Sequence, residues 1–132
     1  MAQHPIELIL LKQWATYIAI PVWLMDVEGN LVFYNEPAEA LLGRRFDEAG
    51  IIHADELADL FETTGLDGEP VPTKELPVVV ALTEHHPAHR PLRIQPLDRE
   101  EWLEIEVTAI PIEGEGARHL GAMAVFWETA RT

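Results

Sequence analysis

The chain contains no cysteine among its 132 residues, and it contains no serine either. The first absence excludes disulfides, thiolate metal ligands and a thiol nucleophile, and the second excludes the serine nucleophiles of hydrolases. Cations are scarce as well, with 9 Lys and Arg against 23 Asp and Glu, so the formal net charge is −14. Nucleic acids and anionic membranes are bound by clustered cations, and we therefore expect neither as a partner.

Long apolar runs are also missing. No stretch approaches the roughly 20 apolar residues of a transmembrane helix. The apolar segment Ile6–Leu11 is interrupted by Glu7 and is not preceded by the basic residues of a secretory signal. We therefore expect a cytoplasmic protein. A length of 132 residues with 48% hydrophobic content is typical of one globular domain.

The segment Val22–Gly43 carries the most specific local pattern. It predicts an apolar strand that ends at Asp26, a tight turn around Gly29, and a second strand that ends before Asn35. Asn35 has the side chain of a helix N-cap, and the proline two residues later is tolerated in a first helical turn. The predicted order is strand, turn, strand and short capped helix.

Three other segments have helical character. Ile6–Ile18 has apolar residues on more than one face, and the excess must pack on a sheet or on a second subunit. In Asp55–Phe61, apolar residues at helical spacing predict one core-facing edge. Pro77–Glu84 contains three valines, which favour a strand, but begins with a proline suited to a first helical turn; we predict a buried helix.

The last third of the chain predicts three antiparallel strands. The first lies within Arg90–Leu97, with prolines near both ends. The second, Trp102–Ile112, alternates between apolar and polar residues. The third, His119–Glu128, is apolar on both faces, which predicts a central position in a sheet covered on both sides. The N-terminal helix is the expected cover for one face.

The predicted class is α+β, with helices inserted into an antiparallel sheet. From about residue 20 to residue 128 this order resembles the PAS domain family, and the details that carry the resemblance are Asp26 before the Gly29 turn, Asn35, Leu41-Leu42-Gly43, Leu76-Pro77, Ala109-Ile110-Pro111 and Gly121-Ala122. The resemblance implies a five-stranded antiparallel sheet with helices between its second and third strands. It also implies a flanking dimerisation helix over residues 1–19 and a PAS-like domain over residues 20–130.

The function implied by this resemblance is a non-enzymatic sensor or interaction domain. It would form a homodimer through the N-terminal helix and act on a downstream signalling protein. The candidate interface residues are Ile6, Leu10, Leu11 and Trp14. A small apolar ligand would lie between the sheet and the Val78–Leu82 helix. Its candidate contacts are Met25, Tyr34, Leu42, Val79, Leu82, Trp102 or Leu103, Met123 and Val125.

The residue types in the chain also limit which cofactors it could bind. The PAS-like light sensors of the LOV type form a cysteine adduct with flavin, and this chain has no cysteine for that step. Non-covalent flavin is disfavoured by the few Asn and Gln residues, and haem by the place of His85 at a helix end. His85, His86 and His89 have metal-ligand side chains, but Pro87 breaks their helical spacing, so we expect no metal.

Two other functions remain open at this point. A small isomerase of the ketosteroid-isomerase type would use Asp26 as its base, although an aspartate before a turn more often caps that turn. A purely structural dimerisation module would have a filled core. A cavity of several hundred Å³ would favour the sensor, and a packed interior would favour the structural module.

Overall fold

The computed structural model describes residues 6–42, 52–53, 62–96 and 100–129. In chain order the elements are α1 (Ile6–Thr16), β1 (Val22–Asp26), β2 (Asn30–Tyr34), α2 (Glu36–Leu42), β3 (Ile52–His53), β4 (Glu62–Thr64), η1 (Thr73–Glu75), α5 (Pro77–Glu84), β5 (Ala88–Gln95), β6 (Leu103–Gly114), η2 (Glu115–Ala117) and β7 (Arg118–Glu128). The helix predicted over Asp55–Phe61 and the expected helix end at Gly43 lie outside the described residues. No helix in the described ranges is long and apolar enough to cross a membrane.

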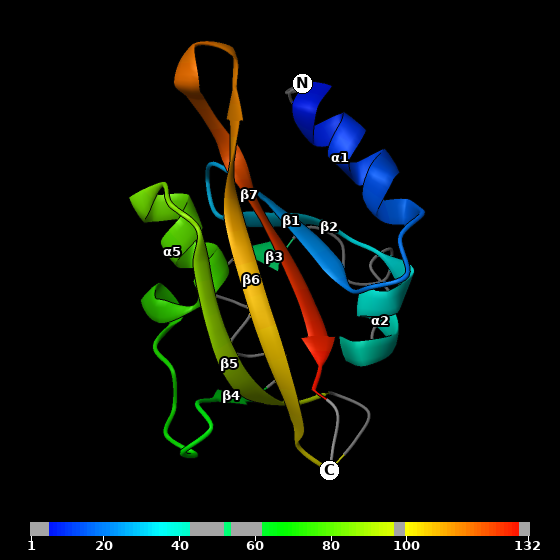
Figure 1. The fold of residues 1–132 in the computed structure, drawn as a ribbon, viewed down its shortest axis with the longest axis vertical. Coiled ribbons are helices and arrows are strands. Elements are labelled where there is room, and N and C mark those ends of the chain that lie inside the picture. The colour runs from blue at the N-terminus through cyan, green and yellow to red at the C-terminus, as the bar shows by residue number, and fades with distance from the viewer. Residues whose placement is uncertain (1–5, 43–51, 54–61, 97–99, 130–132) are drawn as a thin grey trace.

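The strands form one antiparallel sheet in the order β3-β2-β1-β7-β6-β5-β4 (Figure 1). The α+β class is confirmed, and each of the five predicted strands is present. The predicted total of five strands is wrong, because the sheet also contains β3 and β4, one short strand at each edge. With two and three residues, these strands are too short to show an alternating pattern in the sequence. β7 lies between β1 and β6, as its apolar residues on both faces predicted.

The ambiguous valine segment is a helix. Leu76 has an extended backbone, Pro77 follows at the first helical position, and the Val80 N–H donates to the Leu76 carbonyl. The helix ends at His85, which has a left-handed backbone with φ 61°. Val78 and Ala81 are buried against the sheet, so tertiary packing outweighs the strand preference of the valines.

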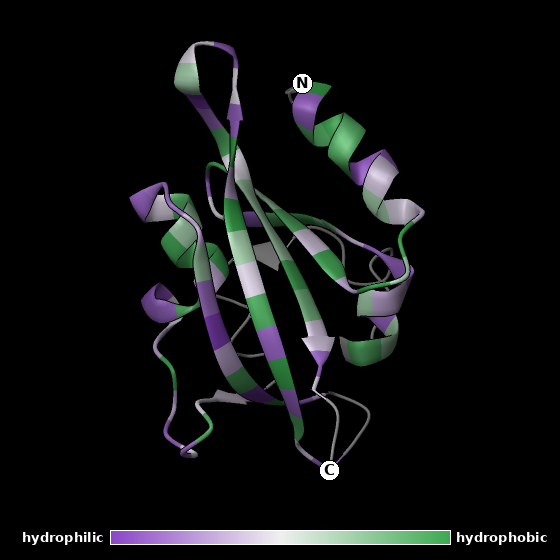
Figure 2. Cartoon of the chain, in the orientation of Figure 1, coloured by the Kyte–Doolittle hydropathy of each residue, from purple (hydrophilic) through white to green (hydrophobic). Residues whose placement is uncertain are grey.

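The sheet separates two apolar cores, which we call the inner and outer cores. The inner core lies beneath α5 and includes Trp23, Met25, Ile105 and Phe126. The outer core lies beneath α1 and includes Leu8, Leu24, Ile112 and Leu120. Figure 1 shows α1 and α5 on opposite sides of the central strands, and Figure 2 shows apolar residues alternating along β6.

The two faces of β7 differ from the predicted assignment. Met123 and Val125 pack in the outer core, whereas Ala122, Ala124 and Phe126 face the inner core. The predicted placement of Met123 and Val125 on the inner face is therefore wrong. Since β7 is apolar on both sides, its sequence pattern does not distinguish the faces, and a shift of one residue inverts them.

An irregularity at Gly121 also moves Leu120 to the outer core. The β6–β7 register shifts between Ile112 and Glu113, so that Ile112 pairs with Gly121 and Glu113 pairs with His119. Gly121 has φ 149°, and a Cβ atom there would collide with the Met25 carbonyl. Glycine is therefore required where β7 passes the Met25 carbonyl of β1.

Asn35 connects four segments of the chain from a buried position. Its Oδ1 accepts hydrogen bonds from the backbone N–H groups of Val22 at 3.0 Å and Ala38 at 3.1 Å. Its Nδ2 donates to the carbonyls of Ala15 and Ile20, both at 2.9 Å. The side chain thus caps α2, as predicted, and also joins the end of α1 and the following linker to the start of β1.

We expect Asn35→Ala to lower the free energy of unfolding by about 3 kcal/mol, because it leaves two backbone donors and two backbone acceptors without their buried partner. Asn35→Ser can still cap the helix and should recover only about 1 kcal/mol of that loss. Urea denaturation measures both values. A serine variant as stable as the native protein would show that Asn35 is a helix cap and nothing more.

Candidate functional site

A cavity of about 210 Å³ lies between α5 and the inner face of the sheet. The described residues that line it are Trp23, Glu62, Thr63, Pro70, Val71, Thr73, Leu76, Pro77, Val78, Leu92, Ile94, Ile105, Val107 and Phe126. A shallower depression between the end of α1 and α2, lined by Thr16–Ala19 and Glu36, Pro37 and Ala40, is largely open to solvent. The apolar cavity beneath α5 is less open to solvent than this depression and is the stronger candidate for a binding site.

Among the described lining residues, the charged and hydroxyl-bearing side chains lie along one wall. Leu92, Ile94, Ile105 and Val107 form its sheet side, and the Trp23 and Phe126 rings pack together with centroids 5.0 Å apart. The polar lining residues are Glu62, Thr63 and Thr73, and all three belong to β4 or to the segment that follows it. Thr63 pairs directly with Ile94, so its side chain lies on the inner face of the sheet.

The predicted ligand contacts lie around this cavity rather than in its described lining. Met25 and Tyr34 are buried in the inner core, and Val79 and Leu82 pack at its edge. On α5, Val78 lines the cavity in place of Val79, which is a rotation of about 100° around the helix.

The remaining predicted contacts lie elsewhere. Trp102 is half-buried beside Arg93, whose guanidinium lies 5.4 Å from the ring centroid, whereas Leu103 is buried in the inner core. Met123 and Val125 lie on the outer face. The side chain of Leu42 is outside the described residues.

Sequence reasoning missed the wall formed by residues 62–76. The Gly and Pro content of Gly65–Pro72 predicts a loop, and a loop pattern does not say which side chains face inward. An isolated bridge between Thr64 and Pro70 folds this segment back on itself, and Val71 and Leu76 pack against the inner core. In the sequence, the apolar residues Val71 and Leu76 beside prolines were the only sign that this segment faces the core.

The described lining residues fit neither haem nor flavin. Haem iron is held by His, Cys, Met or Tyr, and none of these residue types is among them. Asn and Gln, the side chains we expected to hold a flavin ring, are missing from the same set.

The side chains of the histidines that follow α5 contact different residues of the chain. The His85 ring stacks on His119 with centroids 3.6 Å apart. His89 contacts the Thr108 hydroxyl at 2.6 Å and the Glu106 carboxylate at 3.3 Å. Within the described ranges, no three His, Cys, Asp or Glu side chains are grouped to hold a metal ion.

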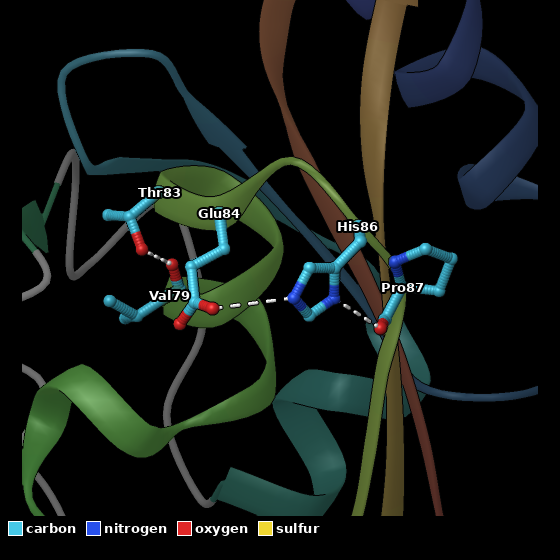
Figure 3. A network of polar contacts seen from close by, with 5 residues as sticks. All are labelled: Val79, Thr83, Glu84, His86 and Pro87. Carbon is cyan, nitrogen blue, oxygen red and sulfur yellow. Dashed lines mark hydrogen bonds and ion pairs between the residues drawn. The ribbon is translucent and has the colours of Figure 1, made fainter.

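His86 lies in the exposed turn between α5 and β5. Figure 3 shows its ring between the Pro87 carbonyl, 2.9 Å from Nδ1, and the Glu84 carboxylate, 3.4 Å from Nε2. The hydrogen bond to the Pro87 carbonyl, followed by the one to Glu84, raises the pKa of His86 above its ordinary value of 6.5.

Asp26 caps the turn between β1 and β2. Its Oδ1 accepts the N–H groups of Glu28 at 3.0 Å and Asn30 at 2.9 Å, and its Oδ2 accepts the Asn30 amide at 3.2 Å. The carboxylate is therefore occupied by local hydrogen bonds, and Asp26 is not among the described residues that line the cavity. This geometry matches the turn-capping role rather than that of a catalytic base.

The helix α1 and the two residues that follow it, Tyr17 and Ile18, carry two apolar stripes. Leu8, Leu11, Ala15 and Ile18 pack against the outer core. A second stripe, which we call the α1 outer stripe, is exposed and consists of Ile6 (66%), Leu10 (56%), Trp14 (49%) and Tyr17 (87%). Three of the four predicted interface residues belong to this stripe, whereas Leu11 packs against the sheet of its own chain.

No family model and no curated protein matches this sequence. Similar solved structures are PAS and LOV domains. The PAS domain of Bordetella pertussis BvgS has a TM-score of 0.71 at 14% identity, with 96% of this chain and 89% of that chain covered. A PAS domain from Colwellia psychrerythraea has a TM-score of 0.64 at 19% identity, with 92% and 96% covered. The Rhodobacter sphaeroides LOV protein has a TM-score of 0.70 at 13% identity, with 96% and 70% covered. These likenesses show the fold.

The raised pKa of His86 predicts a measurable titration. We expect its ring to titrate above 6.5 by NMR in the folded protein, and Glu84→Gln to lower that pKa without removing the contribution of the Pro87 carbonyl. The same ring in urea-unfolded protein provides the reference. The stability gained from this group is present below the unfolded pKa and is lost as the pH rises through the folded pKa. A folded pKa at or below the urea value would contradict the two hydrogen bonds.

Proposed function

We propose, from the PAS fold of this chain, that it is a non-enzymatic sensor domain that binds a small apolar ligand in its inner core and signals as a homodimer. The observation that carries this proposal is the cavity of about 210 Å³ beneath α5. The volume is below the several hundred Å³ expected of a sensor and below the 300–1,000 Å³ of typical ligand pockets, so the proposed ligand is a small molecule rather than a large cofactor. A structural module with a filled core would have no such space.

The α1 outer stripe supports the homodimer. Ile6, Leu10, Trp14 and Tyr17 follow one another at helical spacing, and all are exposed. Large apolar side chains gathered on one exposed face are typical of interaction sites. A second copy of the chain would present the same stripe, and two stripes related by a two-fold axis would cover each other.

The sheet connects the cavity to α1. Trp23 lines the cavity, and its neighbours Val22 and Leu24 pack in the outer core beneath α1. Phe126 lines the cavity in the same way, while the adjacent Val125 packs on the outer side. A ligand that repositions the inner side chains of β1 and β7 would therefore alter the support of α1. The proposed output is a change in the dimer surface offered to a downstream signalling protein.

Native mass spectrometry tests the dimer. We expect a dimer for the native chain and monomer for Leu10→Glu, because the substitution buries a carboxylate in the interface without a partner. Lys12→Gln is the matched control, since it makes the net charge more negative by the same single unit but lies roughly 160° away around the helix. A native chain that is monomeric, or a Leu10→Glu variant that remains dimeric, would reject the α1 interface.

The same spectra test ligand binding. We expect an adduct of low mass on freshly purified protein, retained by Leu66→Phe and lost in Val71→Phe. Both substitutions lie in the loop between β4 and η1, but Val71 lines the cavity, whereas Leu66 is exposed and is not among its described lining residues. An adduct that survives Val71→Phe would place the ligand outside this cavity.

A further inference from the structure

The distribution of polar groups around the cavity identifies a class of ligand. We infer that the cavity selects neutral molecules of one or two rings with a single hydroxyl or carbonyl group, and that it rejects carboxylates and phosphates. This inference rests on the proposed function. Three observations lead to this class: the missing cations in the described lining, the placement of the two threonines, and the volume.

The described lining contains no Lys, Arg or His. The cation nearest in sequence on the same face of β5 is Arg90, two residues before Leu92, and it is held by Glu75, with 3.4 Å between Nη1 and Oε1. An anion placed against the apolar sheet wall would therefore lose its hydration without gaining a partner, and this cost is large for a carboxylate.

A ligand cation has no buried counter-charge here. Glu62 is the one acidic residue in the described lining, and it is solvent-exposed, so water screens its charge. The walls beyond it are the apolar residues of β5, β6 and α5. A neutral molecule is therefore the form that these walls accept at the lowest cost of desolvation.

The threonines define how such a molecule would lie. Thr63 and Thr73 provide hydroxyl groups that can donate or accept a hydrogen bond, and both belong to the wall formed by residues 62–76. The Trp23 and Phe126 rings belong to β1 and β7, with centroids 5.0 Å apart. A ring that packs on these aromatics would direct its single polar group toward the threonines.

The volume limits the size of the ligand. An apolar cavity of about 150 Å³ is known to hold benzene in another protein. The cavity here, of about 210 Å³, is somewhat larger and suits one ring with a substituent or a compact pair of fused rings. Haem and long-chain lipids exceed this space.

Isothermal titration of the full chain with 2-naphthol and 2-naphthoate tests the inference. The two probes share a bicyclic body and differ in the neutral hydroxyl and the charged carboxylate. We expect 2-naphthol to bind at least about tenfold more tightly, because the carboxylate would be desolvated without a partner. Thr63→Val, which removes the hydroxyl and keeps the shape, should weaken 2-naphthol binding by about three- to tenfold.

The controls separate this inference from the proposed function. Val71→Phe should abolish 2-naphthol binding, and Leu66→Phe should leave it unchanged. If 2-naphthoate binds as tightly as 2-naphthol and Val71→Phe abolishes both, the selectivity is wrong but the cavity is a ligand site. If neither probe binds and the native spectra show no adduct, both the selectivity and the ligand-sensing function are wrong. If Val71→Phe leaves 2-naphthol binding intact, the probe binds elsewhere and the inference fails.

Discussion

The side chain of Asn35 is the contact on which the arrangement of α1, β1 and α2 depends. It is 1% exposed and makes four hydrogen bonds, two through Oδ1 and two through Nδ2. Each bond satisfies a backbone group that lies where one element ends or another begins. A buried amide is well suited to this position because it can donate and accept at once. The end of α1 is thereby joined to the sheet on which the helix packs.

The second constraint is that the central strands are shared by two cores. β1 and β7 contribute Trp23 and Phe126 to the cavity wall, and Val22, Leu24 and Val125 to the support of α1. Close-packed interiors transmit displacement because they have little free volume. The cavity and the exposed stripe of α1 therefore lie on opposite faces of one pair of strands.

Much of the fold was predictable, but less of the candidate site was. The alternation along β6, the turn capped by Asp26 and the helix capped by Asn35 are local patterns, and the structure has all three. The placement of Met123 and Val125 failed because β7 is apolar on both sides, so no local pattern selects a face. Val79 was expected in place of Val78 because an almost wholly apolar helix does not mark its inner side.

The sequence by itself determined the α+β class, the five strands it predicted and the absence of thiol chemistry, since each follows from local composition or periodicity. Only the tertiary structure decided which side chains surround the cavity. Val71, Thr63 and Thr73 reach it from β4 and the proline-rich segment that follows, and they meet Trp23 and Phe126 across distant parts of the chain. Such a wall depends on long-range packing, which a local pattern does not encode.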